Sequence, residues 1–256
     1  MRYTTLITGA GSGIGRAVAL ELARRGHHVG MIGRSLSHLR KTSRLLDKIH
    51  CPGYALEEAD VTDCSQVRTA VAHIAAELGP LKSVIASAGV GGGNKRGRHD
   101  RWDTIIRTNL YGVYYTLTEA VSKMDPNPAN PKSFIVIGSL LSHIGIKGST
   151  AYCASKAGLA GLVRALAIEL ADLNIRVNII HPGWVMTPMA QKGLRRLAKT
   201  NKMTLEETER FYRDQVPLRR MSDPSEVAHL IAFLLEGGDM GFTGAAFDMN
   251  NGAWMG

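Results

Sequence analysis

Short apolar runs alternate with longer amphipathic segments along almost the whole chain. The short runs are rich in β-branched and apolar residues, a pattern typical of buried strands, and the longer segments are typical of helices. We expect strands near residues 4–8, 28–33, 53–58, 83–87, 133–138, 176–181 and 245–249, with helices filling most of the gaps. Strands that alternate with helices predict repeated β-α-β units and therefore a parallel sheet.

Right-handed crossovers between these units predict an α/β fold, a doubly wound seven-stranded parallel sheet with helices on both faces. The 256 residues suit one large domain, spanning residues 1–256, with a well-filled core. Ligands of such sheets bind outside the carboxyl ends of the strands, at the point where the strand order reverses. The chemistry of this chain is therefore expected in the loops that follow its strands.

Two segments interrupt the alternation. Residues 126–131 contain three prolines, which cannot continue a helix, and they are expected to form a loop that enters the fifth strand. Residues 187–216 form a long basic insertion after the sixth strand, and residues 222–226 then resemble the N-terminal cap of a helix. An insertion beside the ligand edge is a candidate substrate lid.

Composition and charge narrow the class of protein. Hydrophobic residues make up 45% of the chain and charged residues 21%, values of a globular protein that argue against disorder and against a membrane protein. The apolar runs are short, and the N-terminus enters a strand without a signal peptide, so we expect a cytoplasmic protein. The net charge of +9 suggests nucleic-acid binding as a weaker alternative, but the basic residues are spread along the chain. An anionic cofactor or substrate explains the charge more simply.

The cysteines indicate neither disulfides nor a metal site. Cys51, Cys64 and Cys153 are odd in number, contain no C-x-x-C pair and have no histidine at ligand spacing. Free thiols and no bound metal are therefore expected.

A glycine-rich loop, Thr8–Gly15, lies between the first strand and a helix. Bare backbone N–H groups and the helix dipole favour an anion at this position, and glycines let a pyrophosphate approach closely. The spacing is T-G-x-x-x-G-x-G rather than the usual G-x-G-x-x-G, because Ile14 stands where the latter needs glycine. The residues expected to bind the cofactor phosphates are Gly9, Ser12, Gly13, Ile14 and Gly15.

The end of the second strand predicts which cofactor is bound. An acidic residue there would hold the ribose 2′-hydroxyl of NAD(H), but the chain has Gly33, Arg34 and Ser35. Arg34 can bind a 2′-phosphate through two hydrogen bonds, and no carboxylate repels it. The sequence therefore favours NADP(H) over NAD(H), although Arg34 alone could also be a solvated residue that begins a helix.

The catalytic chemistry is predicted from Tyr152 and Lys156, which are four residues apart at the start of a long helix and so share one face. A phenol titrates near pH ~10, and a neighbouring ammonium would stabilise its phenolate, so Tyr152 is a candidate general acid/base. Ser139 closes the apolar fifth strand, where its hydroxyl can hydrogen-bond a carbonyl oxygen of the substrate. Each residue alone has an ordinary structural explanation, but their combination with the glycine loop favours catalysis.

With these motifs, the whole chain resembles the short-chain dehydrogenase/reductase family, whose members have a Rossmann fold. It is most similar to the branch of 3-oxoacyl-carrier-protein reductases, polyketide ketoreductases and polyol dehydrogenases. The marks of the resemblance, in their expected order, are the Thr8–Gly15 loop, Asp60–Val61, Ala88–Gly89, Asn109 to Gly112, Ser139, Tyr152 with Lys156, and residues 182–187. One departure is Ser87, where the family commonly has asparagine in Asn-Asn-Ala-Gly.

The resemblance implies roles for these positions. Asp60 and Val61 would contact adenine, Ala88 and Gly89 would pass near the adenosine ribose, and Asn109 would hold a water in a proton relay. Tyr152 and Lys156 would also bind the nicotinamide ribose, and the nicotinamide itself would be fixed by Pro182, Gly183, Val185 and Thr187. A homotetramer or homodimer is implied as well.

The sequence thus predicts an NADP(H)-dependent oxidoreductase that interconverts a carbonyl and a secondary alcohol. The expected substrate is a 3-oxoacyl or polyketide-like ketone, which could be bound as a thioester to a carrier attracted by Lys95, Arg96, Arg98, Arg195 and Arg196. A polyol or sugar dehydrogenase is the alternative. A non-catalytic dinucleotide-binding protein is a remote one, because such proteins usually lack the catalytic tyrosine or lysine.

Overall fold

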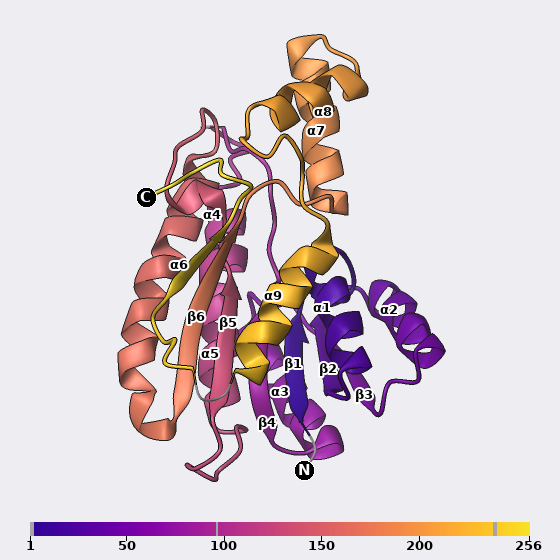
Figure 1. The fold of residues 1–256 in the computed structure, drawn as a ribbon, viewed down its shortest axis with the longest axis vertical. Helices are drawn as coiled ribbons and strands as arrows, with labels where there is room; N and C mark the ends of the chain where they lie inside the picture. Colours follow the sequence, from indigo (N-terminus) through magenta and orange to yellow (C-terminus); the bar gives the residue numbers. More distant parts are fainter. Residues whose placement is uncertain (1–2, 96, 238–239) are drawn as a thin grey trace.

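A seven-stranded, fully parallel sheet forms the centre of the protein (Figure 1). The computed structural model describes residues 3–95, 97–237 and 240–256. The strands are β1 (Thr4–Thr8), β2 (His28–Gly33), β3 (Tyr54–Glu58), β4 (Leu81–Ala86), β5 (Lys132–Ile137), β6 (Ile175–Pro182) and β7 (Ala246–Met249). Their spatial order is β3-β2-β1-β4-β5-β6-β7, so the strand order reverses between β1 and β4. The predicted doubly wound Rossmann fold is confirmed, and every predicted strand is present within two residues of its expected bounds.

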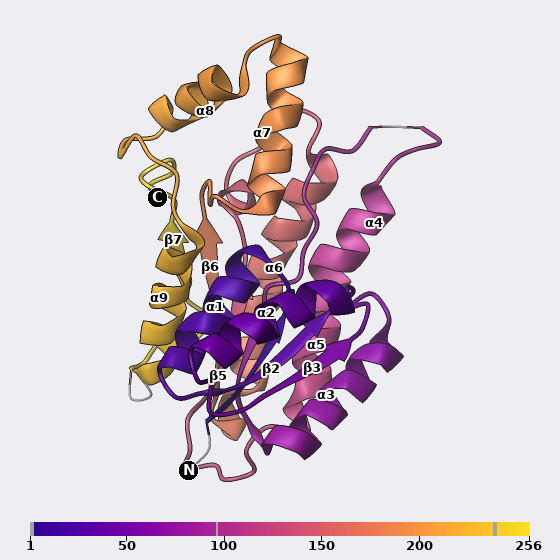
Figure 2. The same ribbon diagram turned by 90° about the vertical axis from the view of Figure 1, so that its right-hand side faces the viewer.

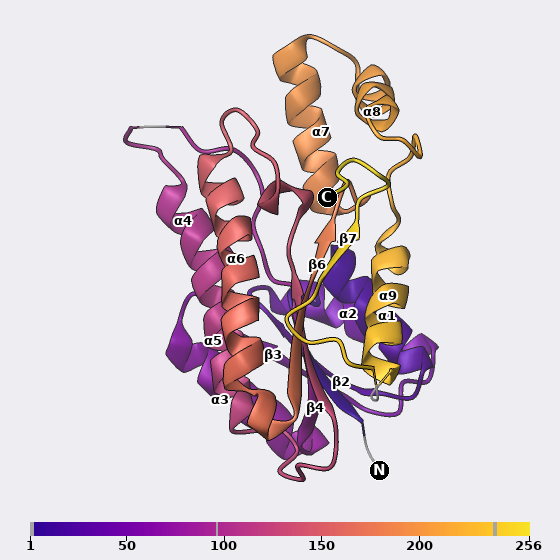
Figure 3. The same cartoon turned by 60° about the vertical axis from the view of Figure 1, so that its left-hand side comes forward.

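Helices cover both faces of the sheet because successive strand residues point to opposite sides (Figure 3). In β1, Leu6 packs into the core beneath α3 (Cys64–Leu78), α5 (Gly112–Val121) and α6 (Thr150–Glu169). Its neighbour Ile7 packs on the other side, beneath α1 (Gly13–Arg24), α2 (Leu36–Lys48) and α9 (Pro224–Glu236). The continuous apolar strands seen in the sequence are therefore buried on both faces.

The segment after β4 reaches α5 through an irregular helix. A short helix α4 (Trp102–Ile106) runs directly into a π-helical turn, η1 (Arg107–Tyr111), and then into α5. Short 3₁₀ turns follow β5 (η2, Leu140–Ser142) and α6 (η3, Ala171–Leu173). Residues 126–131 form the expected loop before β5. Single π-helical turns are frequent at functional sites, and η1 contains Asn109.

The insertion between β6 and α9 forms two helices, α7 (Pro188–Asn201) and α8 (Leu205–Asp214), which stand beyond the carboxyl edge of the sheet (Figures 1 and 2). α9 then begins with the capping signal expected from the sequence. Asp223 accepts a hydrogen bond from the Ser225 amide, and Glu226 accepts one from the Asp223 amide at 2.7 Å.

The 20-residue helix α6 corrects one expectation from the sequence, that no apolar segment is long enough to cross a bilayer. By length and composition alone, α6 meets that criterion. In the fold, however, Leu159, Val163 and Leu166 are buried in the core against the sheet. A helix that is buried on one face in a protein core can therefore be as long and as apolar as a membrane-spanning helix.

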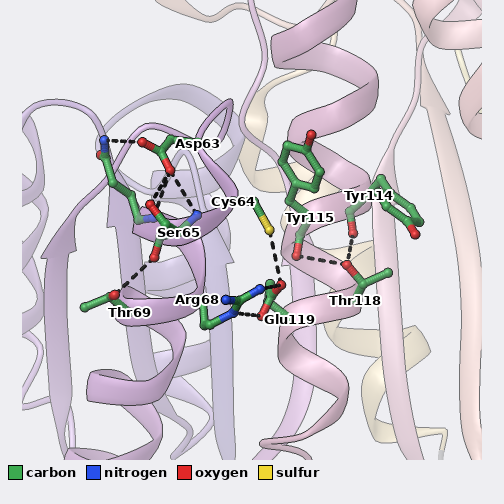
Figure 4. Close-up of polar contacts among 10 residues, drawn as sticks. Asp63, Cys64, Ser65, Arg68, Thr69, Tyr114, Tyr115, Thr118 and Glu119 are labelled. Atoms are coloured by element: carbon green, nitrogen blue, oxygen red, sulfur yellow. Dashed lines mark hydrogen bonds and ion pairs between the residues drawn. The ribbon is translucent and has the colours of Figure 1, made fainter.

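Polar contacts fix the corner that follows β3 (Figure 4). Asp63 caps α3 by accepting hydrogen bonds from the amides of Ser65 and Gln66. Farther along α3, Arg68 donates two hydrogen bonds, of 2.9 and 3.0 Å, to the carboxylate of Glu119 on α5. The two neighbouring helices are thereby tied together, which holds the loop containing Asp60 and Val61 at the edge of the sheet.

The opposite, amino edge of the sheet contains a nearly buried ion pair between Lys82 of β4 and Asp125. The hydrogen bond from Lys82 lowers the pKa of the Asp125 carboxyl to about 2. The ionised form of Asp125 is more favourable in the folded protein than in the unfolded chain. The pair therefore stabilises the fold at pH values above the unfolded pKa near ~4. That stability is lost as the pH falls from ~4 through the folded pKa of about 2.

We predict that Asp125→Asn lowers the free energy of unfolding at pH 7 by about 2–3 kcal/mol, because it leaves Lys82 buried beside a neutral amide. Denaturant titrations at pH 7 and near pH ~2 check this, and the difference from wild type should shrink at the lower pH. Asp172→Asn, at an exposed position of η3, is the control and should change stability little at either pH. An equal destabilisation at both pH values would contradict the assignment.

Candidate active site

The predicted site residues lie along the carboxyl edge of the sheet. Gly9 follows β1, Arg34 follows β2, Asp60 follows β3, Ala88 follows β4 and Ser139 follows β5. The sixth strand ends at Pro182. Segments far apart in the chain meet where the strand order reverses: the Ala88 amide donates a hydrogen bond of 3.2 Å to the Thr8 hydroxyl, which joins the loop after β4 to the end of β1.

Tyr152, Lys156 and Ser139 are brought together as the sequence predicts. Tyr152 and Lys156 lie on one face of the first turns of α6, with the Lys156 ammonium 5.8 Å from the centre of the Tyr152 ring. Lys156 Nζ donates a hydrogen bond of 2.7 Å to the main-chain oxygen of Ile137, the last residue of β5. This contact fixes the start of α6 against the strand that ends beside Ser139.

Burial sets the proton affinities of this group. Lys156 is only 6% exposed, and desolvation lowers its pKa to about 8, because the charged ammonium loses hydration. Burial also raises the pKa of Tyr152, and it outweighs a hydrogen bond with Ser139 that acts in the opposite direction. Lys156, which we expected to favour the phenolate, does not reverse this direction. Tyr152 is therefore a neutral phenol near pH 7, which can donate a proton.

Ser139 is held by its own backbone surroundings. Its hydroxyl accepts a hydrogen bond of 3.1 Å from the Leu141 amide and so caps the turn η2. In the same turn, the Ser142 hydroxyl donates to the main-chain oxygen of Lys156 at 3.0 Å. The turn that contains Ser139 and the helix that contains Tyr152 are thus linked by both side-chain and main-chain groups.

Asn109 is completely buried in the π-helical turn, and its side chain acts as a brace. Its Oδ1 accepts from the Val90 amide at 2.8 Å, while its Nδ2 donates to the Val90 carbonyl and to the Ser155 hydroxyl. These bonds connect the loop after β4 with α6, one turn from Tyr152. The water-holding role implied for Asn109 stays a prediction.

The glycine loop fits a pyrophosphate. Gly9 has φ +71° and Gly13 has φ +54°, conformations that favour glycine. A Cβ on Gly9 would lie 2.9 Å from the backbone of Ala88, and one on Gly15 would collide with the carbonyl of Gly9. The Ser12 side chain makes no capping bond, and the first turn of α1 has no acidic residue. The first amides of α1, Ile14 among them, are therefore available to an anion.

Arg34, which is expected to distinguish NADP(H) from NAD(H), is partly exposed. The Arg34 guanidinium lies 3.9 Å from the Asp60 carboxylate, so these two predicted cofactor residues are neighbours. Ser35 caps α2 by accepting a bond from the His38 amide. The nearby Asp60 corrects the expectation that no carboxylate would lie where a 2′-phosphate binds, although the Arg34 side chain itself is more than half exposed (55%). The adenine contact predicted for Val61 is untested, and Val61 itself is buried.

The segment Pro182–Thr187 connects the sheet to the lid helices. The Gly183 amide donates to the main-chain oxygen of Met249 in β7, and Val185 pairs with Ser222. Thr187 caps α7, and its side chain lies 3.2 Å from the position that a Cβ on Gly13 would take. The base of the lid therefore borders the phosphate loop.

The structure adds two residues that the sequence reasoning missed, Met189 and Arg101, and brings them to the same loop as the predicted Arg196. A Cβ on Gly91 would lie 2.8 Å from Met189 Sδ, and one on Gly92 would lie 2.7 Å from Arg101 and 3.4 Å from Arg196. Met189 and Arg196 of α7 thus lie against the glycine-rich loop after β4. The run of three glycines at 91–93, next to a basic insertion, is the signal that could have indicated this contact.

A metal centre is not indicated. In residues 3–95, 97–237 and 240–256, no three His, Cys, Asp or Glu side chains are grouped closely enough to hold a metal ion. The three cysteines are free thiols.

Known proteins match the chain over almost its whole length. A family model described as enoyl-(acyl carrier protein) reductase matches residues 9–253. The 3-oxoacyl-(acyl-carrier-protein) reductase FabG of Pseudomonas aeruginosa is 34% identical, over 98% of this chain and 96% of that protein. The human (3R)-3-hydroxyacyl-CoA dehydrogenase is 32% identical, over 98% of this chain and 95% of that protein.

Solved structures agree with these relatives. An actinorhodin polyketide ketoreductase with NADPH superimposes with a TM-score of 0.92 at 29% identity, covering 98% of this chain and 97% of that one. The ligand-free aldohexose dehydrogenase of Thermoplasma acidophilum gives a TM-score of 0.82 at 29% identity, with 98% and 94% covered. The fold, the order of the motifs and these similarities agree. The chain belongs to the short-chain dehydrogenase/reductase family of oxidoreductases, in its branch of FabG-like and ketoreductase-like proteins.

Proposed function

We propose that this protein is an NADP(H)-dependent reductase that converts a ketone to a secondary alcohol with Tyr152 as its general acid. The observation that supports this most is the arrangement of Tyr152 and Lys156 on α6 beside Ser139 at the end of β5. Its position at the carboxyl edge, next to a glycine loop that fits a pyrophosphate, is where a nicotinamide cofactor and a carbonyl substrate can meet. The reverse oxidation would use the same groups.

Each residue has a distinct part in the proposed chemistry. When bound, NADPH would supply the hydride that reduces the carbonyl carbon. Ser139 would hold the carbonyl oxygen by a hydrogen bond, and Tyr152 would donate its phenolic proton to that oxygen as negative charge develops there. Lys156 would then stabilise the phenolate and, together with Asn109, help to return a proton from solvent. The raised pKa of Tyr152 suits its role as the acid in reduction.

The basic residues of the proposed lid (187–216) and of the loop after β4 support a thioester-bound 3-oxoacyl or polyketide-like ketone as the substrate. Lys95, Arg98 and Arg195 are exposed, and Arg101 and Arg196 approach the glycines of the loop after β4. Cations gathered there would attract the phosphate of a carrier group. Arg96, which we also assigned to this group, lies outside the described residues. Both curated relatives named above act on acyl thioesters by their names.

The second candidate, a polyol or sugar dehydrogenase, is supported by the similarity to an aldohexose dehydrogenase. A panel of 3-oxoacyl thioesters, cyclic ketones, quinones and keto-sugars, assayed by the loss of NADPH absorbance, separates the two. We expect turnover on the thioesters or cyclic ketones. Activity confined to sugars, or to alcohols with NADP⁺, would favour the second candidate, and cofactor binding without any turnover would indicate a binding protein.

We predict that Tyr152→Phe lowers kcat by about 10²–10⁴-fold, because it removes the proton donor while keeping the ring. NADPH affinity, measured by fluorescence titration, and the melting temperature should change little. Tyr114→Phe, at an exposed position of α5, is the matched control and should keep full activity. A Tyr152→Phe enzyme with wild-type turnover would exclude the mechanism.

We predict that the double variant Gly33→Asp with Arg34→Ala shifts the ratio of kcat/KM from NADPH toward NADH by about 10–100-fold. The new carboxylate would bind the ribose 2′-hydroxyl and repel a 2′-phosphate. A Cβ at position 33 would lie 3.3 Å from the flexible Leu39 side chain, so the substitution fits with a small adjustment. Gly33→Asn with Arg34→Ala is the uncharged control, and unchanged selectivity in the charged variant would refute the assignment.

The assembly and location complete the proposal. β7 is an exposed edge strand, and Tyr111, Tyr114 and Ile168 are exposed apolar side chains on the outer helical layer. These features support a homotetramer or homodimer. We also propose that the protein is cytoplasmic and that residues 187–216 act as the substrate lid of a single catalytic domain.

A further inference from the structure

We propose that His181 is a positioning residue that holds Ser139 in place for the reaction. His181 is the next-to-last residue of β6 and does not touch the substrate edge directly. It is completely buried, and its Nδ1 accepts a hydrogen bond of 3.2 Å from the Ser139 amide. The inference rests on the proposed role of Ser139 as the group that orients the carbonyl oxygen.

The neighbouring backbone leaves room for this imidazole. A Cβ on Gly138 would collide with Nδ1 of His181, so a glycine directly before Ser139 is what allows the ring to approach. The Gly138 amide in turn donates to the main-chain oxygen of Ile180 at 2.7 Å. The last residues of β5 and β6 are therefore held together by one main-chain and one side-chain contact, immediately before the serine.

Only a neutral His181 can make this bond. An acceptor at Nδ1 places the ring proton on Nε2, whereas a charged imidazolium would donate from both nitrogens. Burial lowers the pKa of His181 to about 4, and His143 and, more weakly, Lys156 act in the same direction, whereas Asp248 and a backbone hydrogen bond with Ser139 raise it. His181 is thus neutral at the pH values at which the enzyme would work.

The far side of His181 is closed by a stack of rings. His143, from the loop after β5, lies at 73° to His181 with ring centres 4.7 Å apart. Trp254 stacks flat on His143 at 3.7 Å, and the His143 Nε2 is 3.0 Å from Asp248 Oδ1 of β7. The C-terminal segment and β7 are therefore fastened to the loop that contains Ser139.

This enclosure leaves His181 Nε2 buried without a hydrogen-bond partner in the described part of the chain. A buried donor without a hydrogen-bond partner is unfavourable, so a histidine is a poor choice for strand stability alone. Its other nitrogen does hold Ser139. Ser139 is then fixed at two points: its amide by His181 and its hydroxyl oxygen by the Leu141 amide. The unpaired nitrogen is explained if His181 is retained for positioning.

A matched pair of variants tests the proposal. Asparagine and leucine have nearly the same shape, but only the Oδ1 of asparagine can accept the Ser139 amide bond in place of Nδ1. We expect His181→Leu to lower kcat by about tenfold or more, because Ser139 is no longer held in the productive geometry. We expect His181→Asn to keep most of the activity, and both variants to bind NADPH as wild type does.

Stability separates positioning from a merely structural role. His181→Leu removes a buried unpaired N–H, so its melting temperature should not fall in proportion to its activity. Equal kcat in the Leu and Asn variants, or a loss of activity that follows a loss of stability in both, would overturn the proposal.

A spectroscopic measurement is independent of turnover and of whether His181→Leu folds. Nitrogen chemical shifts of His181 in wild-type protein should show a neutral ring with its proton on Nε2 at pH 7, and the Ser139 amide should be protected from exchange. A proton on Nδ1 would overturn the proposal. If wild type turns over none of the substrates, the proposed function fails, while these shifts still show whether His181 holds Ser139.

Discussion

The burial of Lys156 is the constraint on which the rest of the site depends. An ammonium 6% exposed is costly, and the folded chain offsets this with a hydrogen bond to the carbonyl of Ile137 at the end of β5. That contact, together with the apolar packing of Leu159 and Val163, sets the position of α6 relative to the sheet. Tyr152 follows because it lies one turn earlier on the same helix face. The desolvation that lowers the pKa of Lys156 to about 8 also keeps Tyr152 protonated. The same burial thus keeps Tyr152 in the form that could donate a proton and places beside it the ammonium that would stabilise the resulting phenolate.

The two edges of the sheet contain different kinds of residue. At the amino edge, Lys82 and Asp125 form a nearly buried ion pair, and the strands are continued by close-fitting turns. At the carboxyl edge, glycines at 9, 13 and 15 remove side chains from the places where loops approach each other or a ligand. Buried polar groups there are held by specific hydrogen bonds, as Asn109 is by Val90 and Ser155. The nearly buried ion pair therefore lies at one edge, and the glycines and the candidate catalytic groups lie at the other.

The segment that runs from Thr187 through α7 contacts two glycine-containing loops. Thr187 begins it beside Gly13, and farther along α7 Met189 and Arg196 reach the glycine loop after β4. The loop after β5 is also contacted by the C-terminal part of the chain. Its His143 stacks on Trp254 and lies within hydrogen-bond distance of Asp248 in β7. The proposed roles of Ser139 and of the lid both follow from segments that are distant in sequence.

The sequence by itself determined the architecture and the positions of the recognisable groups. Alternating apolar and amphipathic segments specify the strands because burial on both faces requires continuous apolar runs, and the spacing of four fixes Tyr152 and Lys156 on one helix face. It did not determine the proton affinities, since desolvation depends on what surrounds a group in space: the pKa of Tyr152 is raised although Lys156 lies nearby. Nor did it indicate His181, which resembles any residue of a buried strand until β5 and β6 lie side by side and its Nδ1 meets the Ser139 amide. Local patterns determine elements, because their physics is local, whereas contacts between elements are decided only when the tertiary structure places them together.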